Sequence, residues 1–121
     1  MNKILLLLIE DDPMLAEMYK KFFAASSRYE LVAAKSGKSG LNKIKTLKPK
    51  AVILDLIMED LDGFEILAAM QKAKINIPVV VATNADVKIA ERALSLGAKE
   101  ILRKTLITPQ QVLEVVERYL K

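Results

Sequence analysis

Acidic residues follow two apolar runs that have the length of buried strands. Residues 10–12 are all acidic and follow the apolar run 4–9, and Asp55 follows the apolar run 51–54. Because the carboxyl ends of parallel strands meet at one edge of a sheet, we expect these carboxylates to converge. Crowded carboxylates repel one another unless a cation lies among them, and a hard divalent ion with oxygen ligands is the simplest such cation. The sequence therefore predicts a Mg²⁺-binding acidic pocket with Asp55 as its candidate nucleophile.

Two later apolar runs lead to groups that suit the same chemistry. Thr83 follows the run 79–82, and Lys104 comes shortly after the apolar pair 101–102. Asp55 could attack phosphorus and become an aspartyl phosphate, while Lys104 offers a compact cation to one phosphoryl oxygen and pairs with Asp55 in the empty state. The Thr83 hydroxyl can donate a hydrogen bond to another phosphoryl oxygen. Such transfer depends on positioning and electrostatics, so these few groups are sufficient.

Length and composition exclude several classes of protein. The chain has 121 residues, 52% hydrophobic and 28% charged, and we expect a single domain spanning residues 1–121. It contains no cysteine and no histidine, which excludes disulfide frameworks, thiolate catalysis, triad hydrolases and zinc sites of the usual kinds. No apolar stretch is long enough to cross a membrane. We therefore expect a soluble, cytoplasmic protein with no membrane partner.

Basic residues gather in one segment of the chain. The net charge is +4, and residues 35–50 contain six lysines and no acid. A basic patch can attract acidic partners or nucleic acid. Aromatic residues that could stack on bases are missing from this segment, so we expect no direct binding of nucleic acid. We interpret the lysines as a solvated helix surface.

Short apolar runs alternate with apolar stripes of helical spacing. We expect strands at residues 3–9, 30–34, 51–55, 78–82 and 101–102. Helix N-termini are indicated by Asp12 before Pro13, by Ser36, by Asp86, and by the capping box of Thr108 and Gln111. The expected buried faces are Leu15, Met18, Tyr19, Phe22 and Phe23 in the first helix, and Leu41, Ile44 and Leu47 in the second.

This alternation predicts an α/β fold, a doubly wound five-stranded parallel sheet with helices on both faces. We expect the flavodoxin-like strand order 2-1-3-4-5, in which the switch point lies between strands 1 and 3. Ligands bind outside the carboxyl ends of the strands at such a point. The acids after the first and third strands lie there, so topology and chemistry indicate the same site.

In these features the chain resembles the receiver domain of two-component response regulators over essentially its whole length. The resemblance is carried by residues 10–12, Asp55, residues 62–63 (Asp-Gly), Thr83 and Lys104, in this order and each near a strand end. It implies that Asp55 is the phospho-acceptor, that Thr83 is the switch hydroxyl and that Lys104 contacts the phosphoryl group. It also implies a Mg²⁺ site formed by Glu10, Asp11, Asp55 and the backbone carbonyl of Ile57, with Asp12 serving as a helix N-cap.

The resemblance implies a phosphorylation-controlled signalling switch, and not a multiple-turnover enzyme. The phosphoryl donor would be a phosphohistidine on a sensor histidine kinase or a phosphotransfer protein. No output domain is expected within residues 1–121. The fourth helix, fifth strand and fifth helix would form the surface for a downstream partner or a phosphorylation-dependent homodimer. The polar residues on this surface are Lys88, Glu91, Arg92, Lys99, Glu100 and Arg103.

The chain departs from the family pattern at several positions. Ile101 replaces an aromatic residue that moves with the switch threonine, so we expect the switch to use aliphatic repacking or backbone shifts. Thr105 replaces a proline, and because a cis bond before a non-proline residue costs about 2.5–4 kcal/mol, we expect a trans Lys104–Thr105 bond and a rearranged loop. Glu59 replaces a proline. Asn84 replaces a small residue and could narrow access to Asp55.

Ile57 is apolar, which predicts shielding of the acyl phosphate from water and a long-lived phosphoryl state.

Three other functions are alternatives to a phosphorylation-controlled switch. A receiver fold could serve only as a phosphorylation-independent docking module. The full set of acidic residues, Thr83 and Lys104 argues against that alternative, whereas the missing aromatic residue and proline favour it. A phosphatase of the haloacid dehalogenase type needs a second Asp two residues after its nucleophile, where this chain has Ile57. A flavin carrier would need a loop rich in Ser, Thr and Gly after the first strand, where residues 10–12 are acidic.

Overall fold

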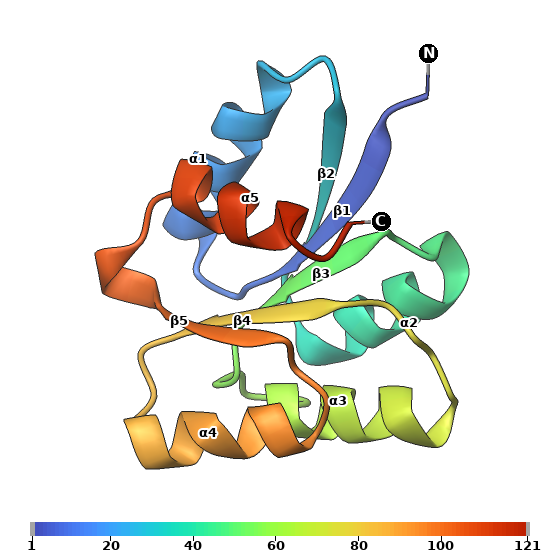
Figure 1. Ribbon diagram of the computed structural model, residues 1–121, viewed down its shortest axis with the longest axis vertical. Coiled ribbons are helices and arrows are strands. Elements are labelled where there is room, and N and C mark those ends of the chain that lie inside the picture. Colours follow the sequence, from blue (N-terminus) through green and yellow to red (C-terminus); the bar gives the residue numbers. More distant parts are fainter. Residues whose placement is uncertain (1, 121) are drawn as a thin grey trace.

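The computed structural model describes residues 2–120, in which a parallel sheet lies between two layers of helices (Figure 1). The strands are β1 (Ile4–Ile9), β2 (Tyr29–Ala34), β3 (Ala51–Leu54), β4 (Val79–Thr83) and β5 (Glu100–Arg103). The helices are α1 (Pro13–Ala24), α2 (Gly37–Leu47), α3 (Gly63–Lys72), α4 (Val87–Ser95) and α5 (Pro109–Glu117), with a short 3-10 helix, η1, at Lys104–Leu106.

The sheet has five parallel strands in the order β2-β1-β3-β4-β5, which confirms the predicted fold class. In the centre of the sheet Ile9 pairs with Leu54, the last residues of β1 and β3. In this register the carboxyl ends of β1 and β3 lie side by side at one edge of the sheet. The residues that follow them, Glu10 and Asp55, are therefore neighbours.

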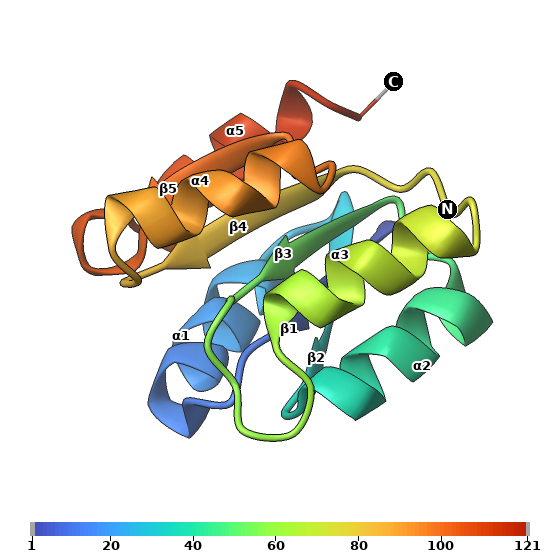
Figure 2. The same cartoon turned by 90° about the horizontal axis from the view of Figure 1, so that it is seen from below.

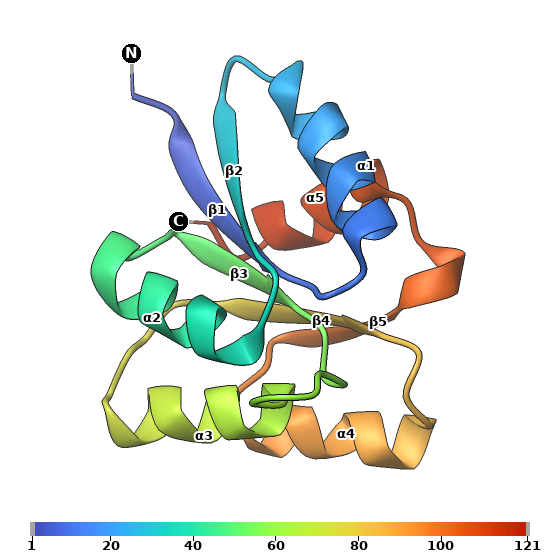
Figure 3. The ribbon, with the colours of Figure 1, turned by 180° about the vertical axis from the view of Figure 1, so that it is seen from behind.

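A hydrophobic core lies on each face of the sheet. Helices α2, α3 and α4 cover one face, where Ile44, Ile66 and Ala93 are almost fully buried against the strands (Figure 2). Helices α1 and α5 cover the other face, where Phe23 and Val116 are buried (Figure 3). The strands β1, β3 and β4 are buried from both sides, which explains their unbroken apolar sequences.

The predicted helix starts are confirmed by side-chain caps. The Asp12 side chain accepts from the backbone N–H groups of Met14 and Leu15, and Asp86 accepts from Lys88 N–H. The predicted capping box of Thr108 and Gln111 begins α5, and Ser36 caps α2. A further capping box, which was not predicted, begins α3 at Asp62 and Glu65. These caps fix where the helices begin, directly after the loops at the carboxyl edge of the sheet.

Two predicted core residues are instead exposed. Met18 is 44% exposed, because the buried stripe of α1 is centred on Tyr19 and Met18 lies one position, about 100°, around the helix. Leu47 is 43% exposed, because it is the last residue of α2. Where a predicted strand limit differs from the observed one, it differs by one residue, and β3 ends at Leu54, so Asp55 lies just beyond it.

The segment after β5 forms a short 3-10 helix with trans peptide bonds. No peptide bond among residues 2–120 is cis, which confirms the predicted trans bond between Lys104 and Thr105. The chain forms η1 before α5 begins.

Among residues 2–120 no helix combines the length and the apolar character needed to cross a bilayer.

Candidate functional site

The strand register places two buried carboxylates side by side at the carboxyl edge of the sheet. Glu10 follows β1 and Asp55 follows β3, and their side chains are 3% and 5% exposed. Backbone bonds extend the sheet to both residues: Glu10 N–H donates to Ala34 O at 3.0 Å and Asp55 N–H to Ile9 O at 3.1 Å. The backbone of the sheet therefore fixes the two carboxylates.

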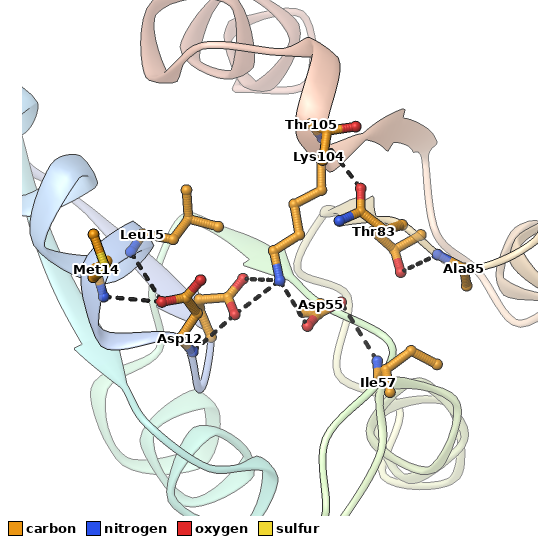
Figure 4. Close-up of polar contacts among 11 residues, drawn as sticks. Asp12, Met14, Leu15, Asp55, Ile57, Thr83, Ala85, Lys104 and Thr105 are labelled. Carbon is orange, nitrogen blue, oxygen red and sulfur yellow. Dashed lines mark hydrogen bonds and ion pairs between the residues drawn. The ribbon is translucent and has the colours of Figure 1, made fainter.

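Lys104 joins these carboxylates from the end of β5 (Figure 4). Its Nζ donates to Glu10 Oε2 at 3.0 Å and to Asp55 Oδ2 at 3.2 Å. The lysine side chain is 17% exposed, so the cluster opens to solvent on the lysine side. The three predicted residues are thus brought together from strands 1, 3 and 5.

Burial dominates the electrostatics of Glu10. Burial raises its pKa, hydrogen bonds from the Asp12 N–H and from the Lys104 ammonium oppose the rise, and the charge of Asp55 adds to it. For Lys104, burial alone would lower the pKa, but the hydrogen bonds and charges of Glu10 and Asp55 outweigh it and raise the pKa. The ammonium is therefore held in its charged form between the two carboxylates.

The same edge offers an all-oxygen donor set for a metal ion. Carboxylate oxygens of Glu10, Asp11 and Asp55 lie within 4.8 Å of one another. Asp11 is exposed, whereas the other two are buried, so an ion could reach the group from solvent. Oxygen ligands at this spacing fit a small hard cation such as Mg²⁺, which keeps several of its waters. The residues present thus fit the predicted metal.

Thr83 lies at the same edge but has a local hydrogen bond. It ends β4, is fully buried, and its Oγ1 accepts from Ala85 N–H at 3.2 Å. No hydrogen bond links it to Lys104 or Asp55 in the part of the chain that the structure describes. In this bond the hydroxyl oxygen is the acceptor, and a threonine hydroxyl can in addition donate one hydrogen bond.

The loop after β3 contributes the backbone of Ile57. Its N–H donates to Asp55 Oδ1 at 3.4 Å, which orients the carboxylate opposite the oxygen held by Lys104. Ile57 is 59% exposed and lies in the loop two residues after Asp55. The predicted role of its carbonyl as a metal ligand stays a prediction.

Other contacts around the site were not predicted from the sequence. Asn84 Oδ1 accepts from Thr105 N–H at 3.1 Å, and Arg103 donates to Ala85 O at 2.7 Å. These bonds link the loop after β4 to the end of β5 and to the segment after it. No residue spacing signals such contacts, because they join side chains to backbone groups that are far apart in the sequence. The Asn84 side chain oxygen is thus engaged by the neighbouring loop.

Gly63 has a steric reason to be glycine. A Cβ at this position would lie 2.8 Å from Asp55 O and 2.8 Å from Leu56 Cα. Its N–H also donates to Leu56 O at 2.9 Å. The start of α3 is therefore pressed against the backbone that carries Asp55.

The sequence is similar to that of known proteins of one family. The family model described as "Response regulator receiver domain" matches residues 6–117. The chain is 35% identical over 117 residues to the probable C4-dicarboxylate response regulator DctR of Bacillus subtilis, an alignment covering 93% of this chain and 52% of that protein. It is 34% identical over 100 residues to the transcriptional regulatory protein GlrR of Escherichia coli K12, covering 82% and 22%.

A solved structure shares the fold. The response regulator receiver domain protein (CheY-like) of Methanospirillum hungatei JF-1 superposes with a TM-score of 0.88 at 22% identity, covering 98% of this chain and 94% of that one. The chain spans about half the length, or less, of the curated relatives named above. Both the family match and the relatives point the same way: this chain belongs to the response regulator receiver domain family.

Proposed function

We propose that the protein is a phosphorylation-controlled switch in which Asp55 accepts a phosphoryl group from a sensor histidine kinase or a phosphotransfer protein. The observation that carries the proposal is Lys104 Nζ, which lies 3.2 Å from Asp55 Oδ2 and 3.0 Å from Glu10 Oε2. A cation held against a buried carboxylate at a sheet's carboxyl edge is placed to receive the new negative charge of a phosphoryl group. The family supports the same role.

In the proposed reaction an Asp55 carboxylate oxygen attacks the phosphorus of a phosphohistidine. The phosphorus–nitrogen bond breaks, and its electron pair leaves on the imidazole nitrogen, which then takes up a proton. Lys104 would turn from Asp55 toward a phosphoryl oxygen, and the Thr83 hydroxyl would donate to another. Mg²⁺, held by Glu10, Asp11, Asp55 and the Ile57 carbonyl, would supply the remaining charge neutralisation.

Movement of the Thr83 side chain toward the phosphoryl group is the proposed switch. Its Oγ1 now accepts from Ala85 N–H, so a move toward the phosphoryl group would alter the loop that leads into α4. Ile101, half-buried in β5, would repack in place of the family's aromatic residue. The altered face of α4, β5 and α5 would then regulate a downstream partner or form a homodimer. The chain would accelerate only its own phosphorylation and dephosphorylation.

Exposed apolar side chains beside the site support docking of a protein donor. Met14 at the start of α1 is 82% exposed, Ile57 is 59% exposed and Leu106 in η1 is 79% exposed. Each lies within a few residues of the acidic cluster or of Lys104. Such residues suit contact with an apolar helix surface on the kinase. We infer that this phosphoryl transfer takes place in the cytoplasm, where a kinase obtains its phosphoryl group from ATP.

The decisive experiment is intact-mass analysis after incubation with phosphoramidate and Mg²⁺. We expect the mass of one added phosphoryl group in the wild type and none in Asp55→Asn or after chelation of Mg²⁺. Glu59→Gln, an exposed carboxylate in the same loop, is the matched control and should be phosphorylated like the wild type.

A phosphorylation-independent docking module is the second candidate, because Ile101 and Thr105 replace the family's aromatic residue and proline. Normal folding with neither phosphoryl uptake nor Mg²⁺ binding would favour that function.

A further inference from the structure

A groove crosses the amino edge of the sheet, at the end opposite Asp55. Its volume is about 1010 Å³. It runs from the end of α2 past the starts of β1 and β4 to the last described residues after α5. Figure 3 shows the end of α2 and the start of β3 on this side of the molecule. The groove is thus formed by chain segments that approach or leave the sheet.

The floor of the groove is apolar. Ile4 from β1, Ile44 from α2 and Leu120 after α5 line it together with Ile75 and Ile77 from the loop before β4. Except for the buried Ile44, these side chains are partly exposed, so they present apolar surface to solvent. An occupant that covers this floor would gain the free energy of burying it.

The rim of the groove is basic. Lys45, Lys48 and Lys50 stand on the α2 side, and Arg28 stands on the side of α1 and α5. No acidic side chain lines the groove among residues 2–120. Arg28 has one weak ion pair, with Glu117 Oε2 at 4.0 Å, and the three lysines have none within the same described range. Three of the six lysines of segment 35–50 therefore border one apolar groove.

We propose that this groove binds an acidic peptide segment of a partner protein, one in which carboxylates alternate with apolar side chains. The size favours a chain segment, because the volume is at the upper limit of the roughly 300–1,000 Å³ typical of small-molecule pockets. The distribution of charge favours the same occupant. Arg28 lies in the segment after α1, whereas the lysines lie at the end of α2 and in the segment after it, and α1 and α2 cover opposite faces of the sheet. These cations therefore match several separate carboxylates better than one compact anionic head group.

The test uses a short synthetic peptide in which glutamates alternate with leucines and phenylalanines. Binding is measured by fluorescence anisotropy and mapped by amide chemical shifts of the full chain at about 150 mM salt, where charges more than about 8 Å apart are screened. We expect shifts at Ile44, Lys45 and Ile77. Peptides with serine in place of the apolar residues, or lysine in place of glutamate, should bind much more weakly.

Matched charge reversals locate the site. Lys45→Glu with Lys50→Glu should weaken binding about tenfold or more, because two attractions become repulsions. Lys20→Glu with Lys21→Glu makes the same change of net charge on exposed positions of α1 outside the groove and should change the affinity little. Dispersed amide spectra for both double variants verify that the chain remains folded.

Several results would overturn the proposal. These are the absence of shifts at millimolar peptide, shifts confined to the α4 and β5 surface, or equal weakening by the two double variants. Tighter binding to phosphatidylglycerol vesicles or to a free fatty acid than to the peptide would identify a different occupant. Asp55→Asn should leave peptide binding unchanged, so this inference and the proposed phosphorylation succeed or fail separately.

Discussion

Lys104 Nζ lies 3.2 Å from Asp55 Oδ2, and this ion pair lies at the acidic carboxyl edge of the sheet. The same ammonium is 3.0 Å from Glu10, so one cation serves two buried carboxylates. The pair joins the residue after β5 to the residue after β3, past the carboxyl end of β4, which lies between these two strands. A phosphoryl group on Asp55 would therefore change the contact that ties β5 to the centre of the sheet.

Removal of the ammonium should destabilise the fold. Lys104→Met leaves Glu10 and Asp55 buried next to each other without a cation, and breaking a buried ion pair costs about 3–5 kcal/mol. We expect a loss of free energy of unfolding near the lower end of this range, measured by urea denaturation without Mg²⁺. Adding Asp55→Asn to Lys104→Met should recover part of the loss, because one of the two repelling charges disappears. An unchanged unfolding midpoint in Lys104→Met would contradict this account of the cluster.

Asp60 should make stability depend on pH in the acid range. Its Oδ2 accepts from Lys38 N–H and its Oδ1 from Gly37 N–H, both at 3.0 Å, at the start of α2. These bonds, the one from Lys38 first, lower the pKa of Asp60 from 3.8 to about 2. Because the pKa is lowered on folding, the stabilisation is complete above about pH 4 and is lost as the pH falls through 2.

The measurement is the unfolding midpoint at a series of pH values for the wild type and Asp60→Asn. The variant should be less stable above pH 4, and the difference should shrink as the pH falls toward 2. Glu59→Gln, an exposed neighbour without these bonds, should follow the wild type. Parallel curves for wild type and Asp60→Asn over the whole range would show that the carboxylate does not cap α2.

The sequence was sufficient to predict the five strands, their order and the meeting of Glu10, Asp55 and Lys104. Those features follow from apolar periodicity and from parallel topology, which brings strand ends to one edge. Two contacts were not predicted, that of Asp60 with α2 and that of Asn84 with Thr105. Each joins a side chain to a backbone group more than twenty residues away in the sequence. Such bonds depend on the final loop conformations and leave no periodic signal in the sequence.

Gly63 should not tolerate a methyl group. Gly→Ala at an exposed helix position usually stabilises a helix by about 1 kcal/mol. At Gly63 the sign should reverse, because the new Cβ would lie 2.8 Å from the backbone at Asp55 and Leu56, which cannot move aside like a flexible side chain. We expect a loss of about 1–3 kcal/mol in the free energy of unfolding.

Urea denaturation of Gly63→Ala, compared with Ala68→Ser on the exposed side of the same helix, measures this effect. A gain of stability in Gly63→Ala would mean that α3 shifts away from the site without cost.

Ile57 should lengthen the life of the proposed aspartyl phosphate. Its N–H is bonded to Asp55 Oδ1 at 3.4 Å, and this apolar residue is 59% exposed in the loop directly after Asp55. In this position it offers no group that could orient a water toward phosphorus, whereas an amide could accept a hydrogen bond from such a water. Ile57→Asn should therefore speed loss of the phosphoryl group several-fold after removal of the donor, while Ile57→Leu should not. Phosphorus NMR follows the decay directly, and equal lifetimes for wild type and Ile57→Asn would refute the shielding role.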